Sequence, residues 1–208
     1  MIELPIDDHL PSIQRSVRDH NRLIVVAPPG TGKTTRIAPA LLPIVDELSA
    51  AQRDAASTAD QRDRHPLVLL LQPRRVAARS AAARIAVEAN CRVGETIGYH
   101  VRFDRAIGPT TRLICMTPGI LLRQLQDDPL LERAGVVILD EFHERSLEVD
   151  LLLGMLLRIQ SELRPDLRIV IMSATLDTAE LQPLLGHPPV IDVAARNYPV
   201  DSRYVRPP

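Results

Sequence analysis

Residues 27–34, with the sequence APPGTGKT, decide the fold of this chain. The apolar run LIVVA at 23–27 predicts a buried strand before them, and a helix is expected to follow. Gly30 and Gly32 let backbone N–H groups converge on phosphate oxygens, because no Cβ stands in the way. The start of the helix adds its positive dipole end to the same anion. The stretch predicts a phosphate-binding loop, with alanine in place of the first glycine of the usual pattern.

The end of this loop carries its chemistry. Lys33 is placed to hold the β- and γ-phosphates of a nucleotide, and the Thr34 hydroxyl is placed to bind Mg²⁺. Lys33 is the only lysine among 25 basic residues, which indicates a GC-rich genome that keeps lysine only where a compact ammonium is needed. The pattern alone does not separate kinases, GTPases and motor ATPases. The residues expected to bind the nucleotide are Pro29, Gly30, Thr31, Gly32, Lys33, Thr34 and Thr35.

The composition bounds the class of protein. A chain of 208 residues with 45% hydrophobic and 25% charged residues suits one packed domain, and we treat 1–208 as such. The net charge of −1 excludes a module that is basic throughout, and two cysteines are too few for a disulfide scaffold. The N-terminus lacks the pattern of a signal peptide, and no apolar run approaches the ~18 residues of a membrane span. We therefore expect a soluble cytoplasmic protein.

Short apolar runs alternate with amphipathic segments along the whole chain. Near-continuous apolar runs are typical of parallel strands that are covered on both faces. This alternation predicts an α/β fold with a mostly parallel sheet and helices on both faces, with ligands at the carboxyl ends of the strands. The expected strands are 23–27, 67–72, 112–117, 136–140, 168–173 and 190–193.

Two segments have helical spacing, 75–90 and 147–164. In the second, apolar residues at steps of four form one stripe, namely Leu147, Leu151, Met155 and Ile159. The polar stretch 46–66 departs from the alternation, and we expect a helix extension followed by a mobile surface insertion. A partner-binding role for that insertion is the less favoured interpretation.

The run at 136–140 ends in Asp140-Glu141-Phe142-His143, an apolar strand followed by two acids, as in a Walker B element. Asp140 would hold Mg²⁺, directly or through water, and Glu141 would contribute to that metal site and orient and deprotonate the attacking water. We place His143 near the γ-phosphate. The alternative for the two acids is an acidic N-cap on the next helix.

The next strand ends in Ser173-Ala174-Thr175. The hydroxyl groups of Ser173 and Thr175 are placed to bond the Walker B side chains and to sense the phosphate state. The alternative is a helix cap. The set of expected catalytic residues is therefore Lys33, Asp140, Glu141, His143, Ser173 and Thr175.

The order of these motifs resembles that of the DEAH-box helicases of superfamily 2, and most closely their bacterial HrpB-type branch. The resemblance covers essentially the whole chain and implies a RecA-like first lobe that uses ATP and Mg²⁺. It also implies that single-stranded RNA or DNA crosses one face, with contacts from Arg74, Arg75, Arg102 and Thr117, and that Arg84 stacks on the nucleotide base. The motifs are APPGTGKT, then PRRVAA at 73–78, GYHVRF at 98–103, TPG at 117–119, DEFHER at 140–145 and SAT at 173–175.

The charge distribution supports a nucleic-acid face independently of the resemblance. Residues 72–123 hold nine arginines and three acidic residues, a local charge of +6, whereas the rest of the chain sums to −7. Arginines that contact phosphates position a strand without reading its sequence. For Arg79 and Arg84, a solvated helical face is the open alternative.

The family pattern continues with a second RecA-like lobe, and residues 197–208 resemble the link toward it. We expect an isolated first lobe that binds ATP–Mg²⁺, hydrolyses it slowly and does not unwind duplexes, because arginine fingers from the other lobe contribute roughly 10³–10⁵ in rate. Two alternatives stay open at this point. One is a small-molecule P-loop kinase, and the other is a nucleotide-dependent adaptor module without turnover.

Overall fold

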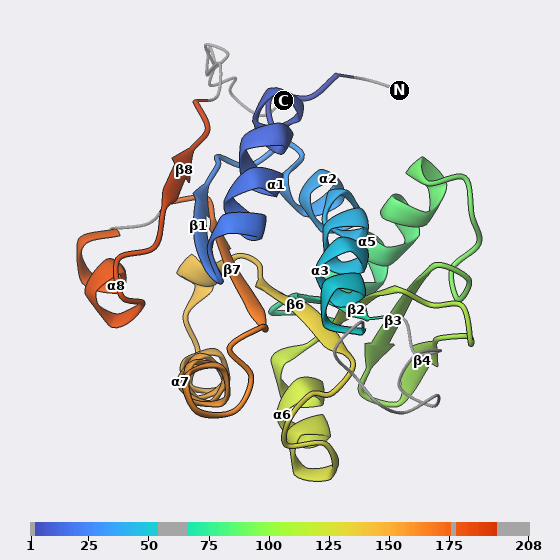
Figure 1. Ribbon diagram of the computed structural model, residues 1–208. Helices are drawn as coiled ribbons and strands as arrows, with labels where there is room; N and C mark the ends of the chain where they lie inside the picture. Colours follow the sequence, from blue (N-terminus) through green and yellow to red (C-terminus); the bar gives the residue numbers. More distant parts are fainter. Residues whose placement is uncertain (1–2, 54–65, 176–177, 195–208) are drawn as a thin grey trace, which may run out of the picture.

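A computed structural model describes residues 3–53, 66–175 and 178–194, and the described strands form one sheet of eight (Figure 1). The spatial order is β4-β3-β5-β2-β6-β7-β1-β8, and all neighbours are parallel except the antiparallel pair β3 and β4. The bounds are β1 Arg22–Val26, β2 Leu67–Leu71, β3 Ile97–Val101, β4 Asp104–Ala106, β5 Leu113–Met116, β6 Ala134–Leu139, β7 Arg168–Ser173 and β8 Val190–Asp192.

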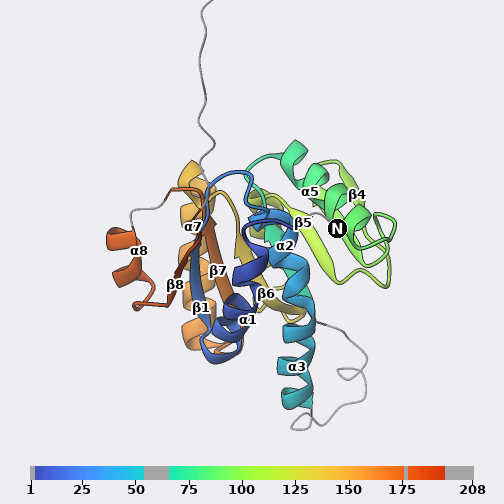
Figure 2. The same cartoon turned by 90° about the horizontal axis from the view of Figure 1, so that it is seen from above.

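Helices cover both faces of this sheet, as the apolar runs predict. In β2 the side chains of Val68 and Leu70 join the apolar cluster under α1, α2, α3 and α5, while those of Leu69 and Leu71 join the cluster under α6, α7 and α8. Figure 2 shows α2 and α3 on one side of the strands and α7 on the other. The helices are η1 Asp7–His9, α1 Leu10–Asp19, α2 Lys33–Ala40, α3 Leu42–Arg53, α5 Arg75–Glu88, α6 Pro118–Asp127, η2 Phe142–Glu144, α7 Leu147–Glu162 and α8 Thr178–Leu184.

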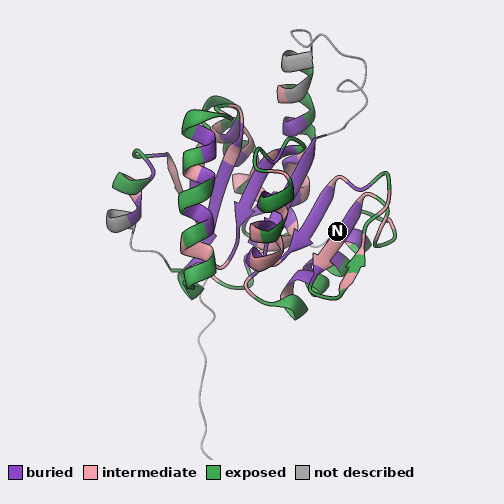
Figure 3. Cartoon of the chain, turned by 90° about the horizontal axis from the view of Figure 1, so that it is seen from below, coloured by how far each residue is buried: buried purple, intermediate pink, exposed green. Residues whose placement is uncertain are grey.

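Each of the six expected strands is present, and the purple strands of Figure 3 are buried along most of their length. Sequence inspection missed β3 and β4, because these two short strands at one end of the sheet are only partly covered and carry no continuous apolar run. The start of the polar stretch is helical, since α3 continues to Arg53. Residues 54–65 and the link at 197–208 lie outside the described part of the chain.

The prediction of the apolar stripe on α7 is wrong, because these four residues do not form the buried face of the helix. Leu147 is 85% exposed, Leu151 is 54% exposed and Met155 is also exposed, and only Ile159 is buried. A helix advances 100° per residue, so a run at steps of four rotates by about 40° each time and leaves the covered face within two turns. The residues that pack inward follow a mixture of steps of three and four, namely Leu152, Leu153, Leu156, Ile159 and Gln160.

The parallel register brings the sequence motifs to one edge of the sheet. Val26, at the end of β1, pairs with Ser173 of β7, and Leu139, at the end of β6, pairs with Leu71 of β2. The loop at 27–34, the DEFH run, the SAT run and the PRR run therefore leave the sheet side by side.

Candidate active site

The loop at 27–34 has the backbone that its glycines predict. Gly30 and Gly32 lie at φ +82° and +91°, in the left-handed region that residues with a Cβ rarely adopt. A Cβ on Gly30 would meet nothing within 4 Å, so the space beside this residue is open. Thr31 is buried and its Oγ1 donates to the Pro28 carbonyl at 2.8 Å. The loop is therefore held internally, while the space beside Gly30 stays open.

Segment 4–7 packs against the outer side of the loop. A Cβ on Gly32 would lie 2.6 Å from Cδ1 of Leu4, and the Ile6 N–H donates to the Thr31 carbonyl at 3.2 Å. Ile6 is fully buried. Sequence inspection assigned no role to these residues, which stabilise the loop from behind.

Lys33 is the first residue of α2 and points its ammonium at the Walker B segment. Its side chain is only 4% exposed, and Nζ lies 3.1 Å from Oε1 of Glu141. Glu141 itself sits at φ +50°, a conformation that costs an L residue roughly 1–2 kcal/mol. The fold holds this carboxylate over the phosphate-binding loop in spite of that cost.

Asp140 is the most enclosed acid of the site, with 5% of its surface exposed. Its Oδ2 accepts from Thr34 Oγ1 and from Gln72 Nε2, each at 2.6 Å, and its Oδ1 accepts from the Glu141 N–H at 2.9 Å. Burial raises the pKa of Asp140, and the hydrogen bond from Thr34 acts against that rise.

A hydroxyl and a desolvated carboxylate 2.6 Å apart are the oxygen ligands that Mg²⁺ accepts, with phosphate oxygens and water for the remaining positions. The described residues contain no group of three or more His, Cys, Asp or Glu side chains that could hold a metal by themselves. A cation at Thr34 and Asp140 would take its remaining ligands from phosphate oxygens or water.

His143 joins the Walker B segment to the SAT run. Its Nδ1 lies 3.3 Å from Oγ of Ser173, 3.4 Å from the Ala174 N–H and 3.5 Å from Oε2 of Glu141. Ser173 Oγ also donates to the Thr175 carbonyl at 2.9 Å. The predicted contact between the two motifs is present for Ser173, whereas Thr175 takes part only through its backbone.

Of the remaining predicted loop residues, Pro29 lies in the turn before α2, and the Thr35 N–H donates to the Gly32 carbonyl at 3.1 Å. Arg84 does not contact the loop. It lies on α5, 62% exposed at its side chain, and pairs with Glu88 at 2.6 Å. Glu88 in turn reaches Arg36 of α2 at 3.5 Å, so a chain of charges connects Arg84 to the helix that follows the loop.

Gln72 is the residue of this candidate site that sequence inspection overlooked. It follows β2 directly, is 3% exposed, and gives Asp140 one of its hydrogen bonds. The available signal was its place as a polar residue at the end of a buried strand, at the edge where the other motifs meet.

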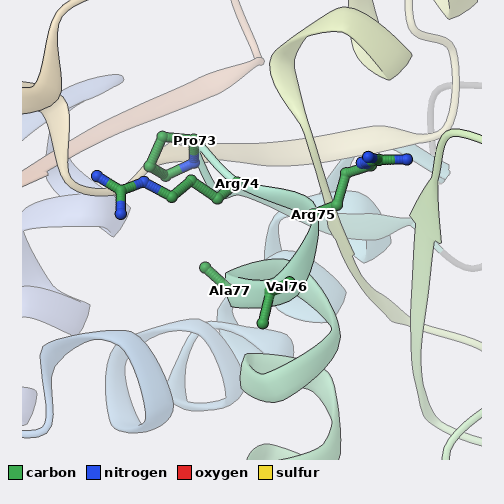
Figure 4. A pocket seen from close by; sticks show the side chains of 5 residues that line it. All are labelled: Pro73, Arg74, Arg75, Val76 and Ala77. Carbon is green, nitrogen blue, oxygen red and sulfur yellow. The ribbon is translucent and has the colours of Figure 1, made fainter.

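The residues expected to contact nucleic acid lie at the carboxyl ends of three adjacent strands. Arg74 and Arg75 follow β2 and point in opposite directions along a hollow of about 760 Å³ that is lined by residues 73–77 (Figure 4). Arg102 follows β3 and lies over the Phe103 ring at 4.7 Å, and Thr117 follows β5 as the residue before α6. A second hollow, of about 470 Å³, separates Arg102 from α6.

Ion pairs reduce the positive charge of this face. Arg74 pairs with Glu144 at 2.9 Å, and Arg79 pairs with Asp104 at 3.4 Å. Arg75 has no ion-pair or hydrogen-bond partner among the described residues. Of the two arginines after β2, Arg75 is the one whose guanidinium is available to a ligand.

Comparison with known proteins places these observations in context. The model of the DEAD/DEAH box helicase family matches residues 10–184. The chain is 40% identical to the ATP-dependent RNA helicase HrpB of Escherichia coli (strain K12), over 99% of this chain and 23% of that protein. It is 37% identical to the human protein named probable ATP-dependent RNA helicase DHX40, over 96% of this chain and 24% of that protein.

The solved structures give the same match. The crystal structure of the Escherichia coli DEAH/RHA helicase HrpB superposes with a TM-score of 0.81 at 40% identity, over 97% of this chain and 24% of that one. The chain thus spans about a quarter of the proteins it resembles. Among the described residues, no helix is both long and apolar enough to cross a membrane.

Proposed function

The chain belongs to the DEAD/DEAH box helicase family, and we propose that it is the ATP-binding first lobe of an RNA or DNA helicase. The observation that carries the proposal is the bond of 2.6 Å between Thr34 and Asp140, residues 106 positions apart in the chain. It joins the phosphate-binding loop to the Walker B acid. Membership of this family leaves out the small-molecule kinase.

The Lys33–Glu141 pair gives the first step of the proposed mechanism. A triphosphate in the loop offers Lys33 several anionic oxygens in place of one carboxylate, so the ammonium moves to the β- and γ-phosphates. Glu141 is then released to orient a water and take its proton. A Mg²⁺ ion held by Thr34 and Asp140 would neutralise charge that develops on the phosphates.

His143 is suited to report on the γ-phosphate, because it touches both Glu141 and Ser173. A change at Glu141 therefore alters the hydrogen bonds at the end of β7. On the neighbouring face, Arg75, Arg102 and Thr117 would hold the backbone of a single strand of RNA or DNA, without reading its sequence.

We propose that hydrolysis by this lobe is slow and that unwinding needs the second RecA-like lobe of a longer protein. The relatives named above are about four times as long as the chain and are named ATP-dependent RNA helicases. The second candidate is a nucleotide-dependent adaptor without turnover. The Lys33–Glu141 pair favours it, since a lysine that returns to this carboxylate would keep the base occupied.

An ATPase assay with and without single-stranded oligouridylate separates these functions. A helicase lobe gives slow turnover that the oligonucleotide stimulates and that Glu141→Gln abolishes, while ATP binding persists. An adaptor binds ATP without turnover in either condition. Robust duplex unwinding by the 208-residue chain would contradict the assignment of the slow, isolated lobe.

A further inference from the structure

The short segment 72–74 touches the Walker B segment at two separate points. Inside, Gln72 donates to Asp140 at 2.6 Å. Outside, Arg74 donates from its guanidinium to Oε2 of Glu144 at 2.9 Å, with the two side chains 73% and 35% exposed. The first contact belongs to the nucleotide site, whereas the second lies at the rim of the arginine-lined hollow (Figure 4).

Glu144 is attached to the catalytic base through a single turn of backbone. Its N–H donates to the Glu141 carbonyl at 2.8 Å and closes η2. Phe142, between them, is 1% exposed and anchors the turn in the core. The carboxylates of Glu141 and Glu144 therefore project from one small unit, the first toward Lys33 and the second toward Arg74.

A strand in the hollow would compete for Arg74. Exposed carboxylate–arginine pairs contribute little to stability, because water solvates both partners well. A phosphodiester of a bound strand presents its own anionic oxygens to a guanidinium that already lines the hollow. Arg74 can leave Glu144 at small cost, and Arg75, which points the other way, is available to the strand from the start.

From this arrangement we propose that the Arg74–Glu144 ion pair is an exchange contact that couples strand binding to the ATP site. When a phosphodiester takes Arg74, Glu144 is released, η2 relaxes, and the grip of Lys33 on Glu141 changes. Glu144 is thus a positioning residue, acting through Glu141. The inference rests on the proposed function, because it needs both ligands to bind.

Coupling of this kind is reciprocal, which makes it measurable by binding alone. If the strand changes the affinity for ATP by some factor, ATP changes the affinity for the strand by the same factor. The probe is fluorescein-labelled single-stranded oligouridylate, titrated by anisotropy with and without saturating ATP–Mg²⁺. The ratio of the two dissociation constants is the coupling factor.

The structure predicts how variants move this factor. Glu144→Gln frees Arg74 and tightens oligouridylate binding by about two- to fivefold, the range of an exposed ion pair, and it brings the coupling factor close to one. Arg74→Ala weakens oligouridylate binding and also loses the coupling. The double variant behaves as Arg74→Ala, since the two residues act through one contact.

Glu162→Gln is the matched control. It removes the same charge from an exposed pair, Arg158–Glu162 at 3.1 Å, at the far end of α7, and it should leave the coupling factor unchanged. The inference is overturned if the wild-type chain binds both ligands without coupling, or if the coupling persists in Glu144→Gln. Either result leaves the proposed function intact. A chain that binds neither ligand overturns both.

Discussion

The two halves of the edge formed by the carboxyl ends of the strands differ in how deeply their charged side chains are buried. On the nucleotide side, Lys33, Asp140 and Ser173 are each at most 5% exposed and are bonded to one another's segments at 2.6–3.3 Å. On the side proposed to bind a nucleic-acid strand (the strand side), Arg74, Arg75 and Arg102 are exposed. Arg74 has a surface ion pair with Glu144, and Arg102 lies over the Phe103 ring.

This difference separates a site whose geometry is fixed by buried contacts from a surface whose side chains can rearrange. Buried charges must be paired, so the geometry of the nucleotide side is specified almost atom by atom. Exposed arginines are solvated whichever way they point, and their positions can change when a strand arrives. A single substitution should therefore have a large effect on the first side and a small effect on the second.

The largest effect is expected at Lys33. Lys33→Ala removes charge-assisted bonds to the phosphates, each contributing about 1.5–3 kcal/mol, and should weaken binding of a fluorescent ATP analogue by roughly 100-fold. Lys33→Arg keeps the charge but not the compact shape, and should also bind poorly. Oligouridylate affinity, measured without nucleotide, is the internal control and should change by no more than about two- to fivefold, the range of an exposed ion pair such as Arg74–Glu144. If Lys33→Ala binds ATP as tightly as the wild type does, the nucleotide does not bind at this edge of the sheet.

The next effect compares two glycines of the same loop. Gly30→Ala and Gly32→Ala both place a Cβ on a left-handed residue, but only the second meets Leu4 at 2.6 Å. Gly32→Ala should therefore lower the free energy of unfolding by about 1–3 kcal/mol more than Gly30→Ala, as overpacking does. Urea denaturation of the two variants measures this difference. Equal losses would mean that segment 4–7 does not brace the loop.

The contrast between motif residues and contacts that cross between strands determines how much of the site could be predicted from the sequence. The meeting of the motif residues at one edge was predictable, because they lie in short motifs at the ends of buried strands and a parallel sheet brings such ends together. The contacts that cross between strands were not predictable. The bond from Gln72 to Asp140 depends on the register of β2 against β6, which a single sequence does not contain.

The faces of the elements were harder to predict than the elements themselves. The six apolar runs are strands, yet the stripe on α7 pointed outward, because Leu is abundant on both sides of that helix. Arginines were equally ambiguous, since Arg74, Arg79 and Arg84 are paired with acids whereas Arg75 is not. Which arginine is available follows from neighbours distant in the chain.

A smaller effect is expected at Arg75, on the strand side. Arg75→Ala removes one phosphate contact, so the salt dependence of oligouridylate binding should become shallower by about 0.7 in log–log slope, with a loss of a few-fold in affinity. ATP affinity should not change. Arg158→Ala is the control, because Arg158 is also exposed but lies on α7 and pairs with Glu162. If both variants change the slope alike, binding is spread over the whole surface and the PRR run is not its centre.

The smallest effect concerns the pH dependence of stability at Asp140. Burial raises the pKa of this carboxyl, so the folded state holds the proton to a higher pH than the unfolded state does. The stability that Asp140 contributes is therefore fully present below the unfolded pKa and is lost as pH rises through the folded one. Asp140→Asn does not titrate, so its melting temperature should rise relative to that of the wild type as the pH increases above about 4, the ordinary pKa of an aspartate.

ATP–Mg²⁺ should reverse this trend, because a cation at Thr34 and Asp140 stabilises the ionised carboxylate. With saturating ATP–Mg²⁺ the wild type should gain in melting temperature toward neutral pH, while Asp140→Asn, which lacks the charge, should gain little. Thermal melts of both proteins across this pH range, with and without ATP–Mg²⁺, make the measurement. A difference between the proteins that does not vary with pH would place the ionisation of Asp140 outside the folding equilibrium. In that case, the cost of burying the Asp140 charge would not explain why a cation binds at this site. The contrast between the tightly specified nucleotide side and the solvated strand side would then depend on packing alone.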